Sequence, residues 1–86
     1  MKDIAIYGAG GFGREVACLI KQINDSLENP RWNFIGFFDD NETLKGCRNE
    51  YGEVLGGQNE LNVWKKPLDI AIAIGNAIVV KLIAGN

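Results

Sequence analysis

The chain has 86 residues, of which 47% are hydrophobic and 23% are charged, a composition typical of one small globular domain rather than a disordered or fibrous protein. A net charge of −2, without a run of lysine or arginine, argues against a nucleic-acid partner and against an anionic membrane surface. No apolar stretch approaches the roughly 18 residues of a membrane-spanning helix and no signal peptide is visible, so we expect a soluble, cytoplasmic protein.

The cysteine and histidine content narrows the possible chemistry. Cys18 and Cys47 are too few and too far apart for a disulfide framework or a CxxC metal site, so we expect free thiols. The chain contains no histidine, which removes the commonest general base, the usual partner of a nucleophilic Ser or Cys, and the commonest zinc ligand. We therefore predict neither catalytic residues nor a metal site.

A glycine-rich turn between a strand and a helix is the most informative motif. The apolar run from Lys2 to Tyr7 predicts a parallel strand, and Gly8, Gly10 and Gly13 then fit the pattern G-x-G-x-x-G. In dinucleotide-binding folds the first glycine allows the turn, the second lets the backbone approach a pyrophosphate, and the third lets helix and strand pack closely. Unpaired N–H groups at the helix start would attract an anion, so the motif predicts a ligand that carries phosphate.

The next segments complete a strand-helix-strand unit. From Phe12 to Leu27 the apolar residues recur with the period of an amphipathic helix, and Pro30 prevents its continuation. The aromatic run 32–38 predicts a second strand, which ends at Asp39 and Asp40. Such units are almost always right-handed and parallel, so we expect the two aspartates to lie beside the glycine-rich turn.

The middle of the chain is less regular. Residues 41–53 show no period and predict a surface loop, in which Lys45 and Arg48 are more easily explained as solvated charges than as phosphate ligands. An apolar pair at 54–55 is followed by two glycines and by a short helix over residues 58–64.

The last part of the chain predicts a third strand over residues 68–74. Gly75 and Asn76 follow it, and Asn76 would be a good N-cap for a helix over residues 77–83. Because that helix would begin so close to the last residue, we expect this chain to be a fragment of a longer polypeptide. The predicted fold of residues 1–86 is therefore a small, Rossmann-like, three-layer α/β domain with a short parallel sheet.

Four motifs in this order resemble the N-terminal domain of bacterial sugar acyltransferases of the sialic acid O-acetyltransferase type. The motifs are Gly8-Ala-Gly-Gly-Phe-Gly13-Arg-Glu-Val, Phe34-Ile-Gly-Phe-Phe-Asp39-Asp40, Val54-Leu-Gly-Gly57 and Ala71-Ile-Ala-Ile-Gly75-Asn76. Together they span essentially the whole chain.

The resemblance implies a Rossmann-like domain that holds a nucleotide-sugar such as a UDP-sugar. A separate C-terminal left-handed β-helix would bind acetyl-CoA, form a homotrimer and supply a catalytic histidine. Its hexapeptide repeats are absent here, so this chain alone is expected to bind its substrate without catalysis and without a cofactor of its own. The substrate-binding residues implied by the resemblance are Gly8, Gly10, Gly11, Phe12, Gly13, Asp39, Asp40, Gly75 and Asn76.

Within that set, Phe12 stands where many members of the family have histidine, and one polar contact is lost with it.

Two other functions fit the residues. The glycine-rich turn and the acid after the second strand would also suit an NAD(P)-binding domain of an oxidoreductase. The other alternative is a non-enzymatic ligand-sensing or oligomerisation module whose glycine-rich turn is vestigial.

Overall fold

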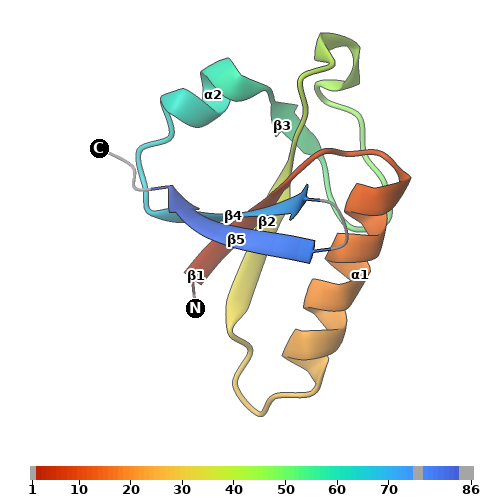
Figure 1. Ribbon diagram of the computed structural model, residues 1–86, viewed down its shortest axis with the longest axis vertical. Helices are drawn as coiled ribbons and strands as arrows, with labels where there is room; N and C mark the ends of the chain where they lie inside the picture. Colours follow the sequence, from red (N-terminus) through yellow and green to blue (C-terminus); the bar gives the residue numbers. More distant parts are fainter. Residues whose placement is uncertain (1, 75–76, 84–86) are drawn as a thin grey trace.

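The computed structural model describes residues 2–74 and 77–83, which form a twisted sheet with helices packed against it (Figure 1). The sheet has five strands in the order β3-β2-β1-β4-β5. The elements in chain order are β1 (Lys2–Tyr7), α1 (Gly11–Asp25), β2 (Trp32–Phe38), the 3-10 turn η1 (Glu42–Leu44), β3 (Val54–Gly56), α2 (Gln58–Asn62), β4 (Leu68–Ile74) and β5 (Ala77–Ile83). Strands β1 to β4 run parallel, as expected of a Rossmann-like α/β domain.

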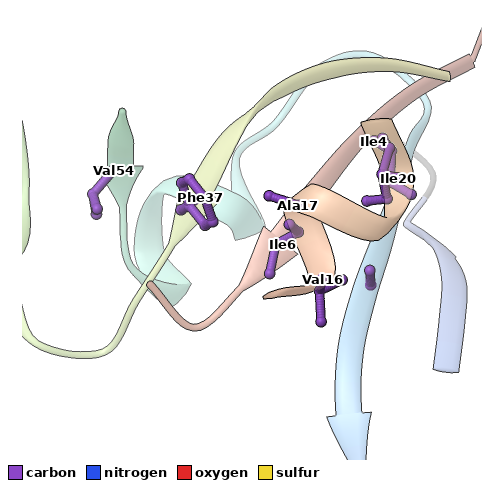
Figure 2. Packing of buried hydrophobic residues seen from close by; sticks show 8 residues of the cluster. Ile4, Ile6, Val16, Ala17, Ile20, Phe37 and Val54 are labelled. Atoms are coloured by element: carbon purple, nitrogen blue, oxygen red, sulfur yellow. The ribbon is translucent and has the colours of Figure 1, made fainter. Parts of the chain in front are cut away.

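Both faces of the sheet carry a hydrophobic core, because successive side chains of a strand point to opposite faces. On one face, Ile4 and Ile6 of β1 pack with Val16, Ala17 and Ile20 of α1, as Figure 2 shows. On the other face, the buried residues include Ala5 of β1, Phe38 of β2 and Leu61 of α2. The helices α1 and α2 thus cover opposite faces, and the predicted three-layer arrangement is confirmed.

The side chain of Asn24 connects the end of α1 to the start of β2 through hydrogen bonds. Its side-chain amide donates to the carbonyl of Trp32 over 2.8 Å, and its Oδ1 accepts from the backbone N–H groups of Arg31 and Trp32 at 3.1 and 3.2 Å. The chain can therefore turn from helix to strand without leaving these backbone groups unpaired. This link sits at the opposite end of α1 from the glycine-rich turn.

Two predictions about secondary structure need correction. Residues 77–83 form the strand β5, antiparallel to β4, and not the predicted helix. The segment contains several β-branched residues, and only two residues separate it from β4, which is the spacing of a β-hairpin. The apolar pair at 54–55 belongs to a strand that was not predicted, the short edge strand β3 (Val54–Gly56).

The remaining described elements agree with the predictions. The strands β1, β2 and β4 have the predicted bounds and α1 ends at Asp25, before Pro30 as predicted, while α2 ends at Asn62, two residues earlier than predicted. The segment 41–53 is a loop that contains only η1 and one isolated bridge, between Arg48 and Glu53. In the described part of the chain, no helix has the length and apolar character needed to cross a lipid bilayer.

Candidate functional site

The glycine-rich turn joins β1 to α1, and its three glycines occupy different environments. Gly8 has φ +109°, a conformation that side chains rarely allow. A Cβ on Gly13 would collide with the carbonyl oxygen of Gly8, so this glycine lets α1 approach the turn. Gly10 has φ −72°, and a Cβ placed on it would meet no atom within 4 Å. The fold therefore explains the glycines at positions 8 and 13 but not the one at position 10.

The start of α1 offers backbone N–H groups to a ligand. Gly10 is the N-cap and, having no side chain, leaves the first turn without a side-chain cap, and that turn holds no acidic residue. The N–H groups of the first turn of an α-helix have no partner within the helix, and the helix dipole makes this end positive. The first turn of this 15-residue helix is thus suited to an anionic group.

Asp39 and Asp40 follow β2 and lie against the glycine-rich turn. The Oδ2 atom of Asp39 accepts a hydrogen bond from the backbone N–H of Ala9 at 2.8 Å, and its Oδ1 accepts from the N–H of Asn41 at 2.9 Å. Asp40 accepts a hydrogen bond on Oδ1 from the hydroxyl of Tyr7. The predicted proximity of the acid pair to the turn is therefore present in the structure.

A pocket of about 390 Å³ opens next to the acid pair. It lies between the loop after β2 and the start of α2, and its lining residues are Asp39, Asp40, Asn41, Glu42, Lys45, Gly56, Gly57, Gln58, Asn59 and Glu60. Four carboxylates and one lysine make this lining acidic. It is suited to a neutral group rich in hydrogen-bond donors, and poorly suited to a phosphate. Within residues 2–74 and 77–83, no cluster of three or more possible metal ligands occurs.

Glu60 fixes the wall of this acidic pocket. Its Oε1 accepts a hydrogen bond from the backbone N–H of Gly57 at 2.6 Å, which forms a capping interaction at the start of α2. Its Oε2 lies 3.9 Å from Nζ of Lys45. The hydrogen bond from Gly57 and, to a smaller extent, the charge of Lys45 lower the pKa of the Glu60 carboxyl, against an opposing effect of desolvation. Glu60 is therefore held as a carboxylate.

A second, smaller pocket of about 170 Å³ lies directly against the glycine-rich turn. Its lining residues are Ile6, Tyr7, Gly8, Gly10, Phe12, Gly13 and Val16. Phe12 is 50% exposed despite its large apolar ring. The surface around the turn therefore combines backbone N–H groups with an aromatic side chain that is available for stacking.

The structure brings most of the predicted site residues to one edge of the sheet, although the glycines and the acids line two adjacent pockets rather than one. Gly11 is the first residue of α1. Gly75 and Asn76 lie outside the described residues. Of the two loop cations, Lys45 lines the acidic pocket, whereas Arg48 pairs with Glu53 at 3.5 Å.

The model of a protein family described as the PglD N-terminal domain matches residues 3–85, which is nearly the entire chain. The chain belongs to this family. It is an N-terminal domain of the sugar acetyltransferase family, and the resemblance seen in the sequence is confirmed. The comparisons found no match among curated proteins and none among solved structures.

Three contributors to the site of this PglD N-terminal domain were missed in the sequence. The sequence indicates Tyr7 only as the last residue of a strand, whereas in the structure its hydroxyl donates a hydrogen bond to Asp40. No pattern in the sequence points to the backbone N–H of Ala9, which donates a hydrogen bond to Asp39. Glu60 stands three residues after Gly57, which is the spacing at which the carboxylate of a capping box accepts from the N-cap N–H, but glycine at the N-cap position weakens this signal in the sequence.

Proposed function

We propose that this PglD N-terminal domain holds the nucleotide-sugar acceptor of an acetyl-CoA-dependent acetyltransferase of surface polysaccharide or glycan biosynthesis. The full-length enzyme would transfer an acetyl group to the sugar. Acetyl-CoA and the trimer interface would belong to the C-terminal domain of such an enzyme. Membership of the sugar acetyltransferase family supports this proposal. We also propose that the domain is cytoplasmic, since the free thiols of Cys18 and Cys47 suit a reducing compartment.

The main observation behind this proposal is the environment of Gly10. Neither its φ of −72° nor any neighbouring atom within 4 Å requires a glycine at this position. A ligand that approaches the backbone closely would supply the missing reason, because the second glycine of this motif is the one that lets a pyrophosphate come close to the backbone. A diphosphate is the group that best matches a helix start of this kind.

The charges around the site suggest how a nucleotide-sugar is oriented. Its diphosphate would lie at the start of α1, where the first turn contains no acidic residue. Its nucleoside would point toward the acidic pocket, where carboxylates accept hydrogen bonds from ribose hydroxyls or from a base N–H. Placing the phosphates in that pocket would set them against Asp39, Asp40, Glu42 and Glu60, which makes the reverse orientation unfavourable.

A comparison of melting temperatures with UDP, a UDP-sugar, NAD and acetyl-CoA tests this function. A ligand at 100 times its Kd stabilises the folded state by about 2.7 kcal/mol. We expect UDP and the UDP-sugar to raise the melting temperature, and NAD and acetyl-CoA to leave it unchanged. Stabilisation by NAD without stabilisation by UDP would instead support a dinucleotide-binding domain. No shift with any of the four would favour a non-enzymatic module.

A further inference from the structure

The two adjacent aspartates are used in different ways by the folded chain. Both carboxylate oxygens of Asp39 already accept backbone hydrogen bonds, from Ala9 at 2.8 Å and from Asn41 at 2.9 Å. Its own N–H donates to the carbonyl of Gly56 over 2.9 Å. Asp39 thus connects the glycine-rich turn, the loop after β2 and the end of β3.

Asp40 is exposed and has a different environment. Its Oδ1 accepts from the hydroxyl of Tyr7, while its Oδ2 has no hydrogen-bond partner among the described residues. It also lines the acidic pocket. A carboxylate oxygen at the edge of a pocket, oriented by one tyrosine and otherwise free, is available to a ligand.

Asp39 helps to hold the glycine-rich turn, the segment that leads into the exposed start of α1. The N–H of Gly8 donates to the carbonyl of Phe38 over 2.6 Å, and the N–H of the next residue, Ala9, donates to Asp39. Two successive peptide groups before Gly10 are therefore attached to the end of β2. A glycine-rich turn has high conformational freedom, so fixing it before the ligand arrives lowers the entropy lost on binding.

We propose that Asp39 is a positioning residue, which holds the glycine-rich turn in the shape that receives phosphate, and that Asp40 is the acid that contacts the nucleoside. This proposal rests on the proposed function and divides a pair that the sequence alone treats as equivalent. It implies that removing the charge of either acid weakens the binding of UDP, but through opposite ends of the ligand.

Titrations of wild type, Asp39→Asn and Asp40→Asn with UDP, uridine and pyrophosphate separate the two roles. Asparagine keeps the size of aspartate but replaces one acceptor oxygen with a donor. We expect Asp39→Asn to weaken UDP and pyrophosphate about tenfold and to leave uridine within about twofold of wild type. We expect Asp40→Asn to weaken UDP and uridine about tenfold and to leave pyrophosphate unchanged.

Hydrogen exchange of the Ala9 amide in the ligand-free protein tests the attachment itself. This amide is expected to exchange at least about tenfold faster in Asp39→Asn than in wild type, and at the wild-type rate in Asp40→Asn. If Asp39→Asn does not fold, Asp39→Ser replaces it, because serine keeps one acceptor oxygen.

Loss of the whole site and loss of the positioning role of Asp39 give different results in these experiments. Wild type that binds neither UDP nor pyrophosphate would overturn the proposed function. Wild type that binds both, together with an Asp39→Asn variant that loses uridine as strongly as UDP, would overturn only the positioning role. An Ala9 amide that exchanges equally fast in Asp39→Asn and wild type would also overturn it.

Discussion

Tyr7 and Asp40 form a side-chain pair at the ends of two neighbouring strands, and this pair should be visible in a titration. The hydrogen bond to Asp40, with smaller contributions from burial and from the charges of both aspartates, raises the pKa of Tyr7 from 10.0 to about 12. The neutral phenol is favoured by folding, so its contribution to stability is complete below pH 10 and is lost as the pH rises through about 12.

Phenolate absorbance during an alkaline titration measures this shift. The pKa of the other tyrosine, Tyr51, is also raised, chiefly by its neighbour Cys18, so the difference between wild type and Tyr7→Phe is needed to isolate Tyr7. In Asp40→Asn we expect the Tyr7 pKa to fall toward its ordinary value. A Tyr7 phenolate that forms near pH 10 in wild type would mean that the pair is absent in solution.

The sequence predicted where Asp39 and Asp40 lie but not which groups their carboxylates bind. The position of Asp39 and Asp40 follows from the end of a parallel strand, which a run of aromatic residues makes evident. The direction of each carboxylate depends on the conformation of the turn opposite, and in particular on the Ala9 N–H. No pattern of residue types encodes that direction, so the different uses of the two acids emerge only from the folded chain.

The packing of α1 against the glycine-rich turn depends on Gly13. A methyl group there would collide with the carbonyl of Gly8, which is backbone and cannot move cheaply. We expect Gly13→Ala to lower the free energy of unfolding by about 1–3 kcal/mol, even though alanine favours helix by about 1 kcal/mol. Chemical denaturation of Gly13→Ala and of wild type measures this difference.

Gly10→Ala is the matched control for that experiment, since its added methyl group meets open space. Its free energy of unfolding should stay within about 1 kcal/mol of wild type, the usual range for a change at an N-cap. Equal destabilisation by the two substitutions would contradict the separate roles assigned to Gly10 and Gly13.

A second prediction concerns the hydrogen-bonded link between α1 and β2. Asn24→Ala removes three hydrogen bonds to the backbone of Arg31 and Trp32, and we expect a loss of about 1–3 kcal/mol in the free energy of unfolding. Gln22→Ala, an exposed site on the same helix, should change it by less than about 0.5 kcal/mol. Thermal melts of both variants check this. A wild-type melting temperature for Asn24→Ala would show that the link contributes nothing.

Elements were predictable where one local signal dominates. The strands β2 and β4 are continuous runs of aromatic or branched apolar residues, and their predicted bounds agree with the structure. The segment 77–83 is apolar throughout, so its periodicity does not separate helix from strand, and its pairing with β4 makes it a strand. Strand β3 has only three residues and depends on β2 for its pairing.

For the whole molecule, the parallel strands bring all the described site residues to one edge of the sheet. The glycine-rich turn follows β1, the acid pair follows β2, and Gly57 with Glu60 follows β3. Residues up to about 50 positions apart in the sequence thus surround one region.

The family and the fold class were both predictable from the order of the motifs. The acidic pocket was not predictable, because it depends on how the loop 41–53 and α2 fold over the edge of the sheet.

We propose above that the start of α1 receives the diphosphate of a nucleotide-sugar at Gly10. Calorimetric titration of UDP into wild type and into Gly10→Ala measures whether this position is needed for binding. We predict that one UDP binds to each wild-type chain and that Gly10→Ala binds at least about tenfold more weakly, because its methyl group blocks the approach to the backbone. Equal affinity of the two proteins for UDP, or no binding by wild type, would contradict the claim.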